Sequence, residues 1–196
     1  MIPLIVLAAG QSKRFGRNKL LEKIDGSTII ERVVKNALSS KADEVIVVLG
    51  FEAHKVLNVL KKFNCKFVFN EEFYSGQSSS VKVGVKAVVE YAEAVIILPG
   101  DMALITPKPI NMIINEYYES RSPIIVASYQ GRLGHPALFD RSLFNEILAI
   151  SEETMGLKAI VRRYRDKIKR VEVNSIEVLV DIDTPEDLEK ILSNKN

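Results

Sequence analysis

The chain has 196 residues, of which 47% are hydrophobic and 27% charged, so it can form a packed core and is not a wholly disordered chain. Lysine and arginine number 27 against 25 acidic residues, and the net charge of +2 argues against a domain that binds nucleic acid over a broad surface. One cysteine and two histidines exclude an intrachain disulfide and argue against a Cys/His structural zinc site. The length predicts a single domain over residues 1–196.

The apolar start of the chain, MIPLIVLAAG, lacks the charge pattern of a signal peptide. Its first basic residues, Lys13 and Arg14, follow the apolar run instead of preceding it. No apolar run approaches the ~20 residues that are needed to span a bilayer. We therefore expect a cytoplasmic protein that does not bind a membrane.

Short runs rich in valine and isoleucine alternate with segments of helical periodicity. We expect strands at residues 2–8, 44–49, 66–69, 94–98, 124–128, 135–139, 170–173 and 177–182. We expect helices at residues 29–38, 53–62, 79–91, 110–118, 143–150, 157–164 and 185–192, the last beginning at the N-cap Thr184. The alternation predicts an α/β fold with three Rossmann-like layers, in which a mostly parallel sheet lies between helices.

The segment LAAGQSKRFGRNKLL, residues 7–21, follows the first expected strand and has the composition of a phosphate-binding loop. In open parallel sheets, ligands bind beyond the carboxyl ends of the strands. Small residues let a polyanion approach backbone N–H groups, while Arg14, Arg17 and Lys19 supply positive charge. A surface turn with solvated bases is the alternative. The spacing matches neither GxxxxGK[ST] nor GxGxxG, which argues against a P-loop ATPase and a Rossmann dehydrogenase.

Three consecutive serines, Ser78, Ser79 and Ser80, stand at the start of an expected helix. One of them can be the N-cap, but three hydroxyls exceed what one cap needs. The positive end of the helix favours a bound base, ribose or phosphate there.

Two aspartates follow expected strands. Asp101 in LPGDMA and Asp183 in VDIDTPEDL place carboxylates at the carboxyl edge of the sheet, where they can hold Mg²⁺ against a triphosphate. Asp181 and Asp183 would share one face of a strand, and Asp183 is the better metal candidate because it is nearer the strand end. For Asp101, a turn that caps its own loop is the alternative.

Taken together, these segments resemble a known family. LAAGQSKRFGRNKLL is similar to the signature loop of nucleotidyltransferases, which move a nucleotidyl group from an NTP. GQSSSVKVGV, LPGDMA, GHPALF and DIDTPEDL follow in the order found in molybdenum cofactor cytidylyltransferases of the MobA-like NTP transferase family. The resemblance covers nearly the whole chain. Sugar-phosphate and isoprenoid nucleotidyltransferases share the first loop, so the later segments are the more diagnostic ones.

The resemblance implies a role for each matching residue. Asp101 and Asp183 would hold Mg²⁺ as the cofactor, and Arg14 and Lys19 would be catalytic because they offset charge that develops on the phosphates. The acceptor, a phosphorylated pterin cofactor, would face Gly134, His135 and Pro136, although a lone histidine is more often structural. The nucleotide would contact Leu7, Ala8, Ala9, Gly10, Ser12, Arg14, Lys19, Ser78, Ser79 and Ser80.

The implied reaction moves CMP from CTP to the terminal phosphate of the molybdenum-pterin cofactor and releases pyrophosphate. A molybdoenzyme would be the recipient of the product. Guanylyltransferase relatives usually have Gly-Gly where this chain has Ala9-Gly10, which favours CTP over GTP. Asn18 stands before Lys19 where many relatives have proline, which leaves the loop less constrained but keeps the cation.

Three alternatives stay open at this point. A molybdenum cofactor guanylyltransferase differs only in the base, and a sugar-phosphate or alkyl-phosphate nucleotidyltransferase differs in the acceptor. A nucleotide-binding chaperone would keep the loop without turnover. The presence of both Asp101 and Asp183 argues against that non-catalytic alternative.

Overall fold

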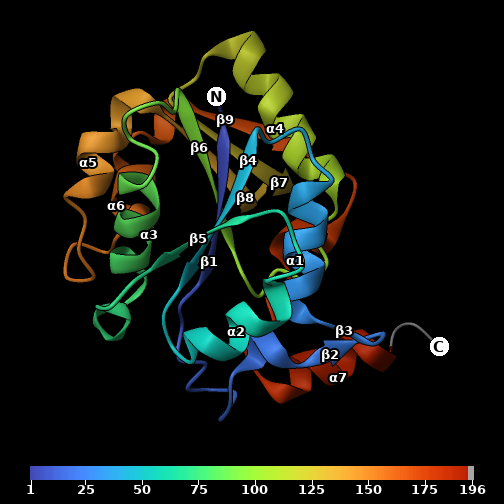
Figure 1. The fold of residues 1–196 in the computed structure, drawn as a ribbon. Coiled ribbons are helices and arrows are strands. Elements are labelled where there is room, and N and C mark those ends of the chain that lie inside the picture. Colours follow the sequence, from blue (N-terminus) through green and yellow to red (C-terminus); the bar gives the residue numbers. More distant parts are fainter. Residues whose placement is uncertain (194–196) are drawn as a thin grey trace.

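The computed structural model describes residues 1–193, which form a central seven-stranded sheet in the order β5-β4-β1-β6-β8-β7-β9 (Figure 1). Of these seven strands, β8 alone runs antiparallel to its neighbours, so the sheet is mostly parallel, as predicted. The strands are β1 Pro3–Ala8, β4 Glu44–Leu49, β5 Lys66–Phe69, β6 Ala94–Pro99, β7 Ile124–Tyr129, β8 Arg132–Asp140 and β9 Ile168–Glu172.

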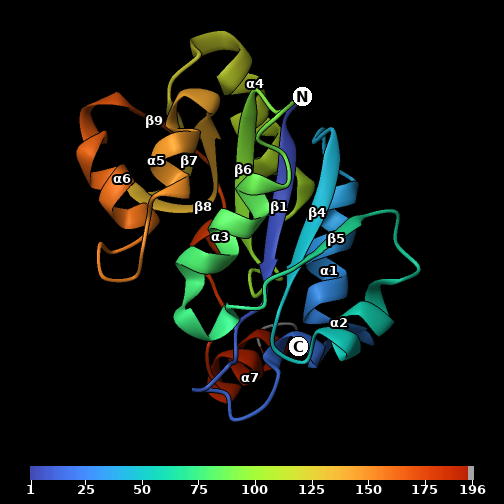
Figure 2. The same cartoon turned by 60° about the vertical axis from the view of Figure 1, so that its left-hand side comes forward.

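Helices cover both faces of the sheet and complete the predicted three layers (Figures 1 and 2). One face carries α1 Ile29–Leu38, α2 Ala53–Leu60 and α4 Pro107–Ser120, while α7 Pro185–Ser193 lies beyond the strand ends and packs into the same hydrophobic core. The other face carries α3 Gln77–Lys86, α5 Phe144–Leu148 and α6 Leu157–Arg163. A short hairpin of β2 Lys23–Ile24 and β3 Ser27–Thr28 precedes α1. Within residues 1–193, every helix is too short or too polar to cross a membrane.

The helices α1, α2, α6 and α7 begin at the residues that the sequence predicts, and side-chain caps explain the starts of α1 and α7. At α1, Thr28 Oγ1 accepts from the Glu31 N–H at 3.3 Å, and Glu31 Oε2 accepts from the Thr28 N–H at 2.8 Å, which is a capping box. At α7, Thr184 Oγ1 accepts from the Asp187 N–H at 3.3 Å, while Asp187 Oδ2 accepts from the Thr184 N–H at 2.9 Å.

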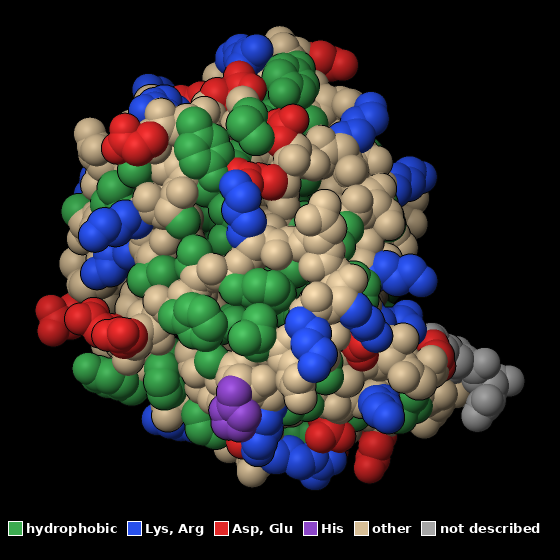
Figure 3. All heavy atoms as spheres, viewed as in Figure 1, with side chains coloured by type: hydrophobic (Ala, Val, Ile, Leu, Met, Phe, Trp, Pro, Cys, Tyr) green, Lys and Arg blue, Asp and Glu red, His purple; other side chains and the backbone are tan. Residues whose placement is uncertain are grey.

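Basic and acidic side chains are interspersed over the face of the molecule that Figure 3 shows, in keeping with the balanced composition.

The strand expected at residues 177–182 is wrong. This segment forms a 3-10 turn, Ile176–Leu179, followed by an irregular stretch that leads to Asp183. Val178 and Ile182 are nonetheless fully buried, because the segment packs against the sheet without pairing to it. A short apolar run has the same sequence signature in both situations. The expected helix at residues 79–91 is shorter and earlier in the structure, where α3 spans Gln77–Lys86.

Candidate functional site

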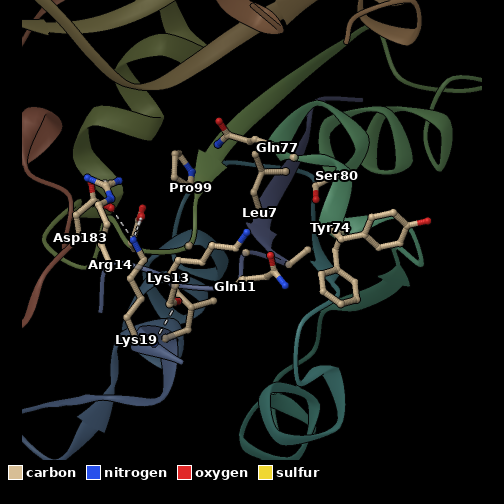
Figure 4. Close-up of a pocket in the computed structure, with 18 residues that line it drawn as sticks. Leu7, Gln11, Lys13, Arg14, Lys19, Tyr74, Gln77, Ser80, Pro99 and Asp183 are labelled. Carbon is tan, nitrogen blue, oxygen red and sulfur yellow. Dashed lines mark hydrogen bonds and ion pairs between the residues drawn. The ribbon is translucent and has the colours of Figure 1, made fainter. Parts of the chain in front are cut away.

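A cavity of about 370 Å³ lies beyond the carboxyl ends of β1 and β6, where ligands bind in open parallel sheets (Figure 4). Residues from the loop after β1, the start of α3, the loop after β6 and the segment before α7 line it. The sequence-predicted site residues among them are Leu7, Ala9, Gly10, Ser12, Arg14, Lys19, Ser80, Asp101 and Asp183.

Local hydrogen bonds and one buried side chain shape the loop after β1, which brings Lys19 to the cavity. Ser12 has a φ of 52°, and its carbonyl accepts from the N–H groups of Phe15 and Gly16. The Phe15 side chain is buried and anchors the loop to the core. Asn18 caps the 3-10 turn Lys19–Leu21 by accepting from the Leu20 N–H at 3.2 Å. Asn18 thus stabilises, by side-chain capping, the start of the turn that carries Lys19.

Lys19 joins two carboxylates that are far apart in the sequence. Its Nζ lies 2.7 Å from Asp101 Oδ2 and 2.8 Å from Asp183 Oδ1, and Arg14 contacts Asp183 Oδ2 at 2.7 Å. Burial alone would lower the pKa of Lys19, but the charges and hydrogen bonds of Asp101 and Asp183 outweigh it and raise the pKa. Burial would raise the pKa of Asp183, but Lys19 and Arg14 lower it. At neutral pH, Lys19 is therefore a charged ammonium and Asp183 a charged carboxylate.

The two aspartates fit a divalent cation. Their oxygens already flank one positive charge, and Asp101 Oδ1 is buried with no hydrogen-bond partner. In residues 1–193, no cluster of three or more histidine, cysteine or acidic side chains has the arrangement of a metal site. Ligand phosphates and water would therefore have to supply the remaining oxygens that Mg²⁺ requires. Asp181, the other carboxylate of the motif, is exposed and does not line the cavity.

The three serines at α3 have different environments. Ser80 lines the cavity, whereas Ser78 and Ser79 do not. Ser79 Oγ donates to the Gly76 carbonyl at 2.7 Å. Ser78 Oγ is buried without a hydrogen-bond partner, and the Ser78 N–H donates to Glu152 Oε1 at 2.6 Å. Gly76, and not a serine, occupies the N-cap position.

The segment Gly134, His135 and Pro136 does not line the cavity but lies at the same edge of the sheet. Because β8 runs antiparallel to β6, the start of β8 lies beside the end of β6. Burial lowers the pKa of His135 and the charge of Asp101 opposes this shift only in part. His135 Nδ1 is buried without a hydrogen-bond partner. A Cβ atom at Gly134 would overlap the Val178 carbonyl, so this glycine allows the segment before Asp183 to pack on β8.

Some predicted residues lie elsewhere, and several lining residues were not predicted. Ala8 is buried in β1, and Arg17 points to Glu22 with Nε–Oε1 at 2.6 Å. Three of the unpredicted residues, Gln11, Lys13 and Leu20, stand inside the loop motif, and others directly precede the serine run, so proximity to the motifs was the available signal. The unpredicted lining residues include Gln11, Lys13, Phe73, Tyr74, Gln77, Pro99 and Gly100.

The chain is similar in sequence to proteins that act on a molybdenum cofactor. The molybdenum cofactor cytidylyltransferase of Escherichia coli (strain K12) is 27% identical over 187 residues, which cover 95% of this chain and 93% of that protein. A probable molybdenum cofactor guanylyltransferase of Aquifex aeolicus (strain VF5) is 30% identical over 200 residues, covering 97% of this chain and 90% of the relative.

The fold has a close counterpart among solved structures. The crystal structure of a Mycobacterium tuberculosis rv0371c homolog from Mycobacterium sp. strain JC1 has a TM-score of 0.85 and 26% identity, and it covers 98% of this chain and 96% of that chain. Residues 4–168 match the family described as "MobA-like NTP transferase domain". The chain belongs to this family of nucleotidyltransferases, as its motifs indicated.

Proposed function

We propose that the chain moves CMP from CTP to the terminal phosphate of the molybdenum-pterin cofactor and releases pyrophosphate. The observation that carries the proposal is the contact of Lys19 with both Asp101 and Asp183 at the wall of one cavity. Cationic groups suited to a triphosphate and carboxylates suited to a divalent cation meet there, which is the combination that phosphoryl chemistry requires.

The two ends of the cavity suit the two ends of a nucleotide. Charged side chains gather at one end, and Figure 4 shows Asp183, Arg14 and Lys19 together there. Tyr74 and Ser80 lie at the opposite end in the same view. The triphosphate would follow the backbone of the loop after β1 to the charged end, and the nucleoside would lie against the uncharged end.

The reaction needs position and charge more than covalent chemistry by the protein. A terminal phosphate oxygen of the acceptor attacks the α-phosphorus in line, the bond to the β-phosphate oxygen breaks, and pyrophosphate leaves. Arg14 and Lys19 would bind the phosphates and offset the negative charge of the leaving group. No nucleophilic side chain is required, because the acceptor supplies the attacking oxygen.

Asp101 and Asp183 would hold a divalent cation, which we assign as Mg²⁺ on the chemistry of its oxygen ligands. When bound, this cation supplies charge neutralisation to the phosphate oxygens. The Lys19 ammonium lies against the same two carboxylates. Its release from them would make its charge available to the triphosphate.

Gly134, His135 and Pro136 would face the acceptor, since they lie at the same sheet edge as Asp101. The unpartnered His135 Nδ1 supports this assignment because a buried polar atom without a partner is costly unless a ligand satisfies it. A molybdoenzyme would receive the product.

A guanylyltransferase is the second candidate, favoured by the 30% identity to the probable molybdenum cofactor guanylyltransferase. Pyrophosphate release with CTP, GTP or ATP, with and without the molybdenum-loaded pterin cofactor, tests both. We expect release that needs the acceptor and is fastest with CTP. A GTP preference above about tenfold would select the second candidate, and nucleotide binding without release would point to a non-catalytic protein.

A further inference from the structure

Asn70 lies just after β5, and its buried side-chain amide forms hydrogen bonds through both its oxygen and its nitrogen. Only 2% of the residue is exposed. Its Oδ1 accepts from the Glu72 N–H at 3.0 Å. Because a backbone N–H can only donate, this contact fixes which end of the amide is the oxygen. The amide nitrogen must then donate, and it does so to Ser79 Oγ at 2.8 Å and Ser80 Oγ at 2.9 Å.

Both serine hydroxyls accept from Asn70, so each has one proton left to donate. The Ser79 proton has acceptors within the protein, the carbonyls of Gly76 at 2.7 Å and Glu72 at 3.0 Å. Ser80 has no acceptor for its proton within residues 1–193, although only 5% of the residue is exposed. Its side chain lines the cavity at the end that carries Tyr74 (Figure 4).

We propose that Asn70 is a positioning residue that makes Ser80 a fixed hydrogen-bond donor toward the nucleoside part of the bound nucleotide. Because the buried Ser80 proton has no acceptor within residues 1–193, the ligand atom that would satisfy it is an acceptor on the base or ribose. This inference rests on the proposed function and adds to it the polarity of one contact. The Asn70 amide occupies one of the two lone pairs of Ser80 Oγ, which keeps the Ser80 proton directed away from Asn70 and free to donate into the cavity.

Asn70→Asp reverses the direction of the hydrogen bonds between residue 70 and the two serines, with almost no change in the shape of the side chain. The new carboxylate still accepts from the Glu72 N–H, but its other oxygen can only accept from the serines. The Ser80 proton would then turn away from the cavity. We expect the Kd of CTP or GTP, whichever binds the parent protein more tightly by titration calorimetry, to rise about threefold to tenfold, as for loss of one hydrogen bond. Ser80→Ala should give a rise of similar size.

A double-mutant cycle separates this effect from repulsion between the new carboxylate and the nucleotide. In the Ser80→Ala background, Asn70→Asp retains the repulsion but has no Ser80 proton to redirect. It should therefore raise the Kd by a clearly smaller factor than in the parent. Ser128→Ala is the matched control, because it removes another buried hydroxyl, which donates to Glu172 at 2.8 Å far from the cavity lining. It should lower the melting temperature without changing the Kd.

If Asn70→Asp does not fold, Asn70→Ala takes its place in the same cycle, since it also removes the donor that orients Ser80. Additive effects of the two substitutions, or a parent-like Kd for Ser80→Ala, would overturn the inference while leaving the proposed function intact. A parent protein that binds neither CTP nor GTP would overturn both.

Discussion

If Asp101 and Asp183 hold a divalent cation as proposed, we expect Lys19 to compete with it for the same two carboxylates, and Lys19→Met tests this competition. The substitution keeps the length of the side chain but removes the charge between Asp101 and Asp183. At a separation of about 5 Å and an effective dielectric constant near 20, the two carboxylates would then repel each other by about 3 kcal/mol. The side chains of Lys19, Asp101 and Asp183 are 12%, 18% and 22% exposed, so water screens part of this repulsion.

We therefore expect Lys19→Met to destabilise the metal-free protein by about 1–3 kcal/mol, which lowers the melting temperature of a chain of this size by roughly 3–10 °C. Adding Mg²⁺ or Mn²⁺ should restore most of this loss, because the cation replaces the missing ammonium. The parent protein should gain less, because its carboxylates are already neutralised. Turnover should still fall by about 10²–10³-fold, as for loss of one preorganised charge.

The assay is thermal unfolding across a metal titration, together with Mn²⁺ binding followed by electron paramagnetic resonance. Lys23→Met, at an exposed lysine of β2, is the control for loss of a positive charge. Equal metal-induced gains in melting temperature for the parent and Lys19→Met, or weaker Mn²⁺ binding by the variant, would refute the competition.

Asp101→Asn and Asp183→Asn should each reduce the melting-temperature gain on adding Mg²⁺, since asparagine lacks the charge that attracts the ion; an undiminished gain in both would remove the metal assignment. Gly134→Ala should destabilise the fold by about 1–3 kcal/mol and lower nucleotide turnover, because the new methyl group displaces the Val178 carbonyl and with it the segment that carries Asp183; parent-like stability in urea would contradict this. Burial would raise the pKa of Glu31, but hydrogen bonds and a nearby lysine lower it to about 2 from 4.5. Its stabilising effect should be complete above about pH 4.5 and disappear as the pH falls toward 2, so Glu31→Gln should cost about 1–3 kcal/mol at pH 7 and almost nothing at pH 2, measured by urea unfolding.

Most of the fold could be predicted from the sequence because its signals are local. The runs EVIVVLG and AVIILPG form buried strands, and the caps at Thr28 and Thr184 begin helices as their side chains dictate. The segment at residues 177–182 misled the prediction because burial, and not strand pairing, accounts for its apolar residues. Periodicity alone does not separate these two situations.

The composition of the site was predictable, but its internal contacts were not. The motifs identified Lys19, Asp101 and Asp183 separately, yet their meeting point depends on the order of strands in the sheet, which no local pattern encodes. Likewise, the three serines look equivalent in the sequence. Their different hydrogen-bond partners depend on the fold, because Asn70 contacts Ser79 and Ser80 whereas the Ser78 N–H donates to Glu152.

The most direct test of the proposed function follows the label of the nucleotide into the product. The parent protein is incubated with Mg²⁺, the molybdenum-loaded pterin cofactor and CTP that carries ³²P on either the α- or the γ-phosphate. We expect the α-label in the pterin product and the γ-label in pyrophosphate, in equal amounts, with neither formed when the acceptor is omitted. Release of the γ-label as inorganic phosphate, or an α-label that stays in CTP and free CMP, would contradict nucleotidyl transfer to this acceptor.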